Sequence, residues 1–136
     1  MKETICGVIG VVGAAIASAL GGWNASLTTL AILMAIDYIS GVVVAGIFHA
    51  SNKSESGSLN SNAGWKGLAK KCMELLFVLI AYRMDVVMGT TYLKDAVCIA
   101  FIVNELLSIT ENAGLMGLPI PSVITDAIEV LKSKKE

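Results

Sequence analysis

Residues 5–22 form an unbroken run of eighteen residues without a charged side chain. A helix of about 20 residues crosses the roughly 30 Å hydrocarbon core of a bilayer, and about 17 is near the minimum. The whole chain is also very apolar: 55% of its 136 residues are hydrophobic, 15% are charged, and the mean hydropathy is +0.74. Soluble domains average roughly 45–50% apolar and about 25% charged residues. The sequence therefore predicts an integral membrane protein.

Three further apolar stretches lie at residues 27–50, 72–88 and 93–109. Asp37 interrupts the first of these, and the other two carry three charged residues each. Because a charged side chain in hydrocarbon is costly, those two stretches can span a membrane only if their charged faces are shielded from lipid. We expect an all-α fold, with about four transmembrane helices and a short C-terminal amphipathic helix.

The segments between the stretches are polar connections. Ten of the fourteen residues at 51–64 are Ser, Asn or Gly, a composition typical of a flexible linker. Pro119 and Pro121 end any helix before them, and the tail from Ser122 has apolar residues at helical spacing. Two placements fit this tail helix, on the membrane surface or packed on protein. The predicted order is a transmembrane hairpin at 1–50, a flexible polar cytoplasmic loop at 51–65, a second hairpin at 66–111, and a Pro-containing turn with an amphipathic cytoplasmic tail at 112–136.

The basic residues predict an orientation. Four spans place the N-terminus, the polar loop and the tail on one side, which then holds eight of the ten Lys and Arg residues, among them Lys66, Lys70 and Lys71. The positive-inside rule places that side in the cytoplasm, so both termini are expected inside. Residues 1–19 also fit a cleavable signal peptide, since small residues follow the apolar run. Cleavage would leave three spans.

The sequence contains no recognisable catalytic or metal-binding pattern. The three cysteines are far apart, and His49 has no nucleophile or metal ligand at a useful spacing. The net charge of −1 gives no basic footprint for nucleic acid. We therefore expect a protein that is not an enzyme and has no cofactor, no metal and no nucleic-acid partner.

Polar residues within the apolar stretches are the candidate functional residues. Asp37 should be protonated, paired or facing water, and a cation such as Arg83 is one structural partner considered for it. Glu74 and Asp85 share a helix face, whereas Arg83 lies on the opposite side and must pair across helices or reach an interface. A polar stripe in the fourth stretch could line water or join helices by hydrogen bonds. The candidates for pore lining or assembly are Asp37, Glu74, Arg83, Asp85, Asn104, Glu105, Ser108, Glu111 and Asn112.

Small residues form two rows on the first predicted helix. One row contains Gly10, Ala14 and Ser18, and the other contains Gly13 and Ala17. Residues at this spacing of four lie along one edge of a helix, where small side chains permit close contact between backbones. Association between subunits and packing within one chain both fit this pattern.

Several runs resemble the toxin-secretion/phage-lysis holin family of small bacteriophage membrane proteins. Their order and approximate spacing match from about residue 33 to residue 131, whereas residues up to Thr29 match nothing specific and the polar loop looks long for the family. The runs are Asp37-Tyr38-Ile39-Ser40-Gly41, then Asn60-Ser61 with Gly64-Trp65-Lys66-Gly67 and Lys70-Lys71, then an apolar run ending at Asp85, and Asn104-Glu105-Leu106-Leu107-Ser108-Ile109-Thr110-Glu111-Asn112 followed by Gly114, Gly117, Leu118, Pro119 and Pro121.

The resemblance implies a non-enzymatic protein that accumulates in the host cytoplasmic membrane, forms homo-oligomers and opens lesions. Endolysin or a toxin would then leave the cytoplasm without necessarily contacting this protein. It adds Gly41 to the pore or assembly candidates and implies no catalytic role for any matched residue. The matched positions are Asp37, Gly41, Lys66, Gly67, Lys70, Lys71, Asp85, Glu105, Ser108, Glu111, Asn112 and Pro119. A membrane scaffold or anchor and a small ion-coupled transporter using Asp37 or Glu105 are the alternatives.

Overall fold

A computed structural model describes residues 1–135, which form five α-helices and no strand. The predicted all-helical class is therefore confirmed. In chain order the helices are α1 (Lys2–Ala19), α2 (Ala25–Gly46), α3 (Ser61–Met88), α4 (Leu93–Leu115) and α5 (Ser122–Lys135).

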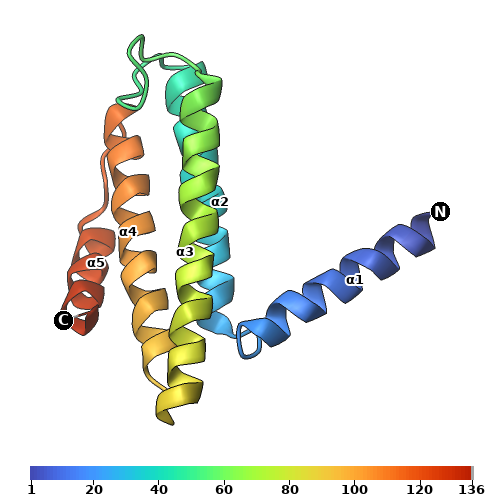
Figure 1. Cartoon of the computed structure of the whole chain (residues 1–136). Helices are drawn as coiled ribbons and strands as arrows, with labels where there is room; N and C mark the ends of the chain where they lie inside the picture. Colours follow the sequence, from blue (N-terminus) through green and yellow to red (C-terminus); the bar gives the residue numbers. More distant parts are fainter. Residues whose placement is uncertain (136) are drawn as a thin grey trace.

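Three of the helices form an antiparallel bundle. The long helices α2, α3 and α4 pack against one another, and the shorter α5 turns back to lie along α4 (Figure 1). The first helix stands apart: α1 extends away from the bundle, and none of its residues from Lys2 to Ala19 is buried. This differs from the expected first hairpin, because α1 and α2 are joined by a turn but do not lie side by side.

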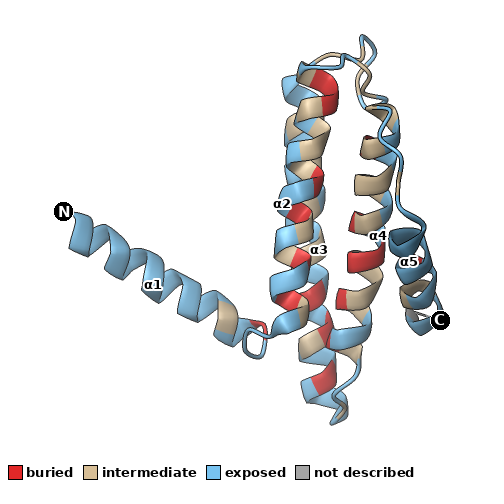
Figure 2. Cartoon of the chain, turned by 180° about the vertical axis from the view of Figure 1, so that it is seen from behind, coloured by how far each residue is buried: buried red, intermediate tan, exposed pale blue. Residues whose placement is uncertain are grey.

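The apolar core fills the half of the bundle next to the α1–α2 and α3–α4 turns. Leu27 and Leu30 of α2, Val78 of α3 and Cys98 of α4 are fully buried there. Each helix of the bundle buries only one face, as the narrow stripes of buried residues in Figure 2 show. The opposite faces stay apolar: the exposed large side chains include Ile32, Ile36 and Ile39 of α2 and Leu76, Ile80, Met84 and Val87 of α3. Such outer faces suit contact with lipid.

Two of the helices are long and apolar enough to cross a membrane by themselves. They are α1 and α2, each of which has at least 18 residues with at most two charged side chains among them. Helices α3 and α4 were the stretches expected to need shielding of their charges. By length and composition alone, two helices of the all-helical chain are candidate spans, and the arrangement with four spans remains a prediction.

Helix α3 is longer than the apolar stretch that predicted it. The Asn60 side chain accepts hydrogen bonds from the backbone N–H groups of Asn62 and Ala63, at 2.8 and 3.3 Å. Asn is a favoured N-cap residue because it satisfies free N–H groups in the first turn. The helix therefore begins at Ser61, inside the segment expected to be a flexible loop, and the loop occupies residues 47–60.

Asp85 fixes the turn between α3 and α4. One carboxylate oxygen accepts hydrogen bonds from Thr90 Oγ1 at 2.6 Å and Leu93 N at 3.0 Å, and the other accepts from Lys94 N at 2.9 Å. Gly89 ends α3 in the left-handed conformation that glycine adopts most easily. A single carboxylate thus binds the free N–H groups at the start of α4.

The turn between α1 and α2 is held by residues of the other two bundle helices. Lys94 is buried and donates from Nζ to the Gly22 carbonyl at 2.9 Å, and its ammonium group lies 5.7 Å from the centre of the Tyr82 ring. The same ring packs against Gly21, whose φ is +82°. A side chain at residue 21 would collide with Tyr82, so this close approach requires glycine.

Helix α5 packs on protein, one of the two placements considered for the tail. Ile128 is buried and Leu131 is half-buried against the core. Val123, Ile124 and Val130 stay exposed, so only part of the predicted apolar side faces α4.

Candidate functional site

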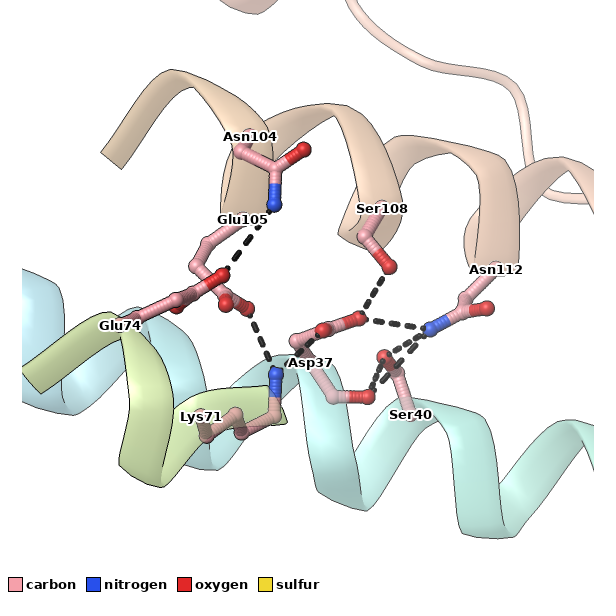
Figure 3. A network of polar contacts seen from close by, with 8 residues as sticks. All are labelled: Asp37, Ser40, Lys71, Glu74, Asn104, Glu105, Ser108 and Asn112. Carbon is pink, nitrogen blue, oxygen red and sulfur yellow. Dashed lines mark hydrogen bonds and ion pairs between the residues drawn. The ribbon is translucent and has the colours of Figure 1, made fainter. Parts of the chain in front are cut away.

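An ion triad joins the three bundle helices at mid-length. The Lys71 ammonium group lies 2.6 Å from Asp37 Oδ2 and 2.8 Å from Glu105 Oε2 (Figure 3). The side chains of Lys71, Asp37 and Glu105 are only 15, 8 and 2% exposed. Charges this well buried need partners, and here one cation from α3 serves one carboxylate from α2 and one from α4.

Asp37 also accepts hydrogen bonds from side chains of α4. Ser108 Oγ donates to Asp37 Oδ1 at 2.6 Å, and Asn112 Nδ2 lies 3.2 Å from the same oxygen. Asn112 also donates to the Asp37 carbonyl at 3.3 Å and to Ser40 Oγ at 2.8 Å (Figure 3). Hydrogen bonds from α4 therefore complete the environment of the carboxylate in α2.

The polar stripe predicted on the fourth stretch is divided between two surroundings. Glu105, Ser108 and Asn112 are spaced three and four residues apart, so they share the face of α4 turned toward Asp37. Asn104 and Glu111 lie beside this face, where Asn104 Nδ2 donates to Glu74 Oε1 at 3.3 Å and Glu111 Oε1 accepts from Asn52 at 2.6 Å. Within one chain the stripe joins helices and the loop, the second use considered for it.

The network holds more negative than positive groups. Three carboxylates, those of Asp37, Glu74 and Glu105, lie around the single Lys71 ammonium group (Figure 3). Glu74 Oε2 is buried and has no hydrogen-bond partner among the described residues. Buried polar atoms are normally bonded, so an orphaned carboxylate oxygen in this position calls for an explanation.

A polar cleft of about 540 Å³ lies above the triad. It reaches from the loop at residues 51–60 down to Asp37 and Glu105, between α2, α3 and α4. Gly41, Lys66, Lys70, Glu74, Asn104, Ser108 and Glu111 are also among its lining residues. Most of the predicted pore or assembly candidates are thus brought to one surface. Below the triad the apolar core closes the bundle.

Two of the predicted candidates lie elsewhere. Arg83 is exposed on α3 and forms no ion pair in the described part of the chain, so the proposed pairing with Asp37 is not found. Asp85 is buried in the α3–α4 turn, away from the cleft. No group of His, Cys, Asp or Glu among residues 1–135 could hold a metal ion.

Sequence reasoning placed Lys71 among the cytoplasmic basic residues and missed its role in the triad. A signal for that role is present in the sequence. The buried residues Val78, Ala81 and Asp85 of α3 are three and four residues apart, and the same spacing carried backwards reaches Glu74 and Lys71. The inward-facing stripe of α3 therefore begins at Lys71.

Comparison with known proteins gives the family. The bacteriophage holin family matches residues 14–133, which include all of α2, α3 and α4. The chain belongs to this family. Among its relatives, a "Probable holin" of Bacillus phage phi105 is 35% identical over 111 residues, covering 81% of this chain and 76% of the relative.

Further relatives of this holin-family chain come from bacteria. An uncharacterised protein of Halalkalibacterium halodurans is 37% identical over 128 residues, 90% of this chain and 89% of the relative. An uncharacterised 14.9 kDa protein of Clostridium perfringens is 32% identical over 117 residues, 85% and 83% of the two chains. No solved structure is significantly similar to the chain.

The family match confirms the resemblance read from the sequence and extends it toward the N-terminus. It begins at Ala14, in the second half of α1, whereas the motifs alone started at about residue 33. Holins are phage membrane proteins that associate with themselves, and the family is not an enzyme family. Membrane association and self-association are therefore general properties that membership brings to this chain.

Proposed function

We propose that this chain inserts in the cytoplasmic membrane of a bacterial host, assembles from several copies, and opens lesions through which endolysin or a toxin leaves the cytoplasm. The observation that carries the proposal is the exposure of the apolar helix α1. It is apolar along its length and wholly unburied, although the three helices of the bundle are packed together. An apolar helix that the rest of the described chain leaves unburied must be covered by lipid or by another copy.

The packing of the bundle supports four spans, and the basic residues of the N-terminus, loop and tail then favour both termini inside. If α2 crosses the bilayer, α3 and α4 must accompany it, because both pack against it. Their main charges are shielded in the way that spanning requires, since Glu105 bonds Lys71 and Asp85 is turned into the α3–α4 turn. Exposed Arg83 lies about one turn from the end of α3, within reach of the lipid head groups.

The polar cleft supplies a surface for a lesion. Within one chain its charged groups bond one another across three helices. When copies associate, the same groups can face water between subunits, while the apolar outer faces of α2 and α3 remain in lipid. The residues proposed to line the lesion are Asp37, Gly41, Glu74, Asn104, Glu105, Ser108 and Glu111.

The test is inducible expression in a bacterium, with membrane potential and escape of a folded cytoplasmic enzyme followed together. Abrupt loss of potential with escape of the enzyme is the expected result. Loss of potential alone, dependent on a transported solute and abolished by Asp37→Asn, would favour an ion-coupled transporter. Neither signal, with the chain inserted and abundant, would overturn lesion formation and favour a scaffold or anchor.

A further inference from the structure

Two carboxyl groups of the network face each other across α3 and α4. The carboxyl group of Glu74 lies within hydrogen-bonding reach of that of Glu105 (Figure 3). Glu74 Oε2 is buried and no described residue donates to it, and the Glu105 side chain is only 2% exposed. Two ionised carboxylates placed in this way repel each other, and neither can donate a hydrogen bond to the other.

The lysine of the network does not relieve this conflict. Lys71 donates to Asp37 Oδ2 at 2.6 Å and to Glu105 Oε2 at 2.8 Å, so its charge is already shared by two carboxylates. It forms no hydrogen bond or ion pair with Glu74 in the described part of the chain. Three carboxylates with one ammonium group between them leave the network short of a hydrogen atom that could be donated.

Asp37 also lies beside Glu105, but its carboxylate is well supplied with donors. It accepts hydrogen bonds from three side chains, one on α3 and two on α4, and such bonds favour the ionised form. Among residues 1–135, Glu105 accepts from Lys71 alone. Glu74 accepts one long hydrogen bond, at 3.3 Å from Asn104. The two carboxyl groups that are poor in donors are therefore Glu74 and Glu105.

We propose that Glu74 and Glu105 bind one proton between them at neutral pH and so form a carboxyl–carboxylate pair that joins α3 to α4. The O–H group of one donates to an oxygen of the other in a charge-assisted hydrogen bond. This bond supplies the donor that Glu74 Oε2 lacks and removes one negative charge from the network. Both residues line the polar cleft, which gives the proton a route to and from water on the side of the loop.

The other charged groups that line the cleft are exposed. They are Lys66 and Lys70 of α3, Lys53 of the loop and Glu111 of α4. The three lysines form no ion pair with a described residue, and Glu111 accepts from Asn52 at 2.6 Å. Because water and salt screen exposed charges, the proton balance at the pair depends mainly on the buried network itself.

Infrared spectroscopy of the full chain in detergent detects the proton directly. A protonated carboxyl group has a C=O stretching band separate from the bands of carboxylates, and this band shifts when D₂O replaces H₂O. We expect the band at neutral pH, with the intensity of one carboxyl group per chain. Glu74→Gln should abolish it, because the glutamine N–H group replaces the shared O–H group and leaves Glu105 ionised beside Lys71.

Two other glutamates provide matched controls. Glu111→Gln removes a carboxyl group from the same cleft, and Glu129→Gln removes one from the exposed face of α5. Both variants should keep the band at full intensity, because neither residue belongs to the pair. Circular dichroism checks that each variant keeps its helices.

The pH dependence of stability is an independent test. A glutamate in the unfolded chain is ionised at neutral pH, so folding of the pair takes up one proton, and the free energy of unfolding falls as the pH rises. One proton corresponds to an increase of about tenfold in the unfolding equilibrium constant for each pH unit, until the folded pair itself releases the proton. Glu74→Gln should remove this contribution, and Glu129→Gln should keep it.

Several results would overturn the shared proton. These are absence of the band at neutral pH, its survival in Glu74→Gln, its loss in Glu111→Gln, and a pH dependence of stability that Glu74→Gln leaves unchanged. All of these measurements use the chain in detergent, whereas lesion formation is measured by escape of the reporter enzyme from cells. A chain that has the band and opens no lesion would keep this inference and overturn the proposed function, and lesions without the band would do the reverse.

Discussion

Lys71 and Asp37 lie 34 positions apart in the sequence, yet the ammonium nitrogen of one is 2.6 Å from a carboxylate oxygen of the other. Because Lys71 also bonds Glu105, a single cation holds α3 to both of its neighbours in the bundle. The contact is an electrostatic requirement, since the buried carboxylates of Asp37 and Glu105 share this one cation. It is also a geometric requirement, since it fixes how α2, α3 and α4 are rotated against one another.

Removing this cation should therefore destabilise the bundle. In Lys71→Met, Asp37 and Glu105 would remain buried without a counter-charge, and breaking a buried pair from one side typically costs about 3–5 kcal/mol. We expect a loss toward the lower end of this range, because Ser108 and Asn112 still bond Asp37. Thermal unfolding in detergent, followed by circular dichroism, measures it.

The neighbouring lysine is the matched control for this prediction. Lys70 is exposed and unpaired among the described residues, so Lys70→Met should change stability by less than about 0.5 kcal/mol. Equal losses for the two variants would show that the triad contributes nothing specific.

Neutralising Glu74 should have the opposite effect. Glu74→Gln removes one of three carboxylates around Lys71 and gives the orphaned position an N–H group that can donate to a carboxylate. Relief of an unsatisfied buried group is worth about 1–3 kcal/mol, so we expect a gain of about 1 kcal/mol. Glu129→Gln is the control, because the Glu129 side chain is 72% exposed. A destabilised Glu74→Gln would contradict this account of the network.

The α1–α2 turn permits a comparison of two adjacent glycines. Gly21 and Gly22 both have positive φ, at +82° and +95°, but an added methyl group meets the Tyr82 ring at residue 21 and open space at residue 22. Both alanine variants should lose roughly 1 kcal/mol for the backbone conformation. Gly21→Ala should lose about 1–3 kcal/mol more, because the ring or the turn must move.

A double-mutant cycle identifies the cause of that difference. Replacing Tyr82 by Leu should remove most of the extra cost of Gly21→Ala and leave the cost of Gly22→Ala unchanged. Equal losses for the two glycine variants in thermal unfolding would show that the close approach between Gly21 and Tyr82 does not constrain the turn.

The sequence predicts the helices better than it predicts their partners. Charge-free and weakly charged runs identify α1 and α2 because hydrocarbon imposes a length and a composition, and Pro119 and Pro121 separate α4 from α5 by removing backbone donors. The start of α3 was missed because Asn60 acts locally as a cap within a segment whose composition is typical of a linker.

For the candidate site, too, the sequence predicts which residues share a helix face better than it predicts which helices they contact. Helical spacing groups Glu105, Ser108 and Asn112 on one face, and the structure turns that face to Asp37. Which cation pairs with Asp37 depends on how far α3 is shifted along α2. The spacing of residues within one helix carries no information on that shift. The sequence therefore suggested Arg83 as a partner and left Lys71 among the cytoplasmic basic residues, whereas the packing of the helices selects Lys71.

The small-residue rows of α1 remain a prediction that concerns contacts between copies. A methyl group added at Gly10 or Gly13 would meet no other part of the described chain within 4 Å outside the backbone of its own helix, and Ala14 is exposed. If copies associate through the row that contains Ala14, a larger side chain there holds the two backbones apart and removes the van der Waals contact that drives association in lipid. Ala14→Leu should weaken self-association by about tenfold, or about 1.4 kcal/mol. Ala15→Leu, which adds the same bulk outside both rows, should leave it unchanged. Chemical cross-linking of membranes across a range of expression levels measures association, and resistance to alkaline extraction confirms that both variants insert. If both leucine variants associate as the unchanged chain does, this row does not form the contact between copies.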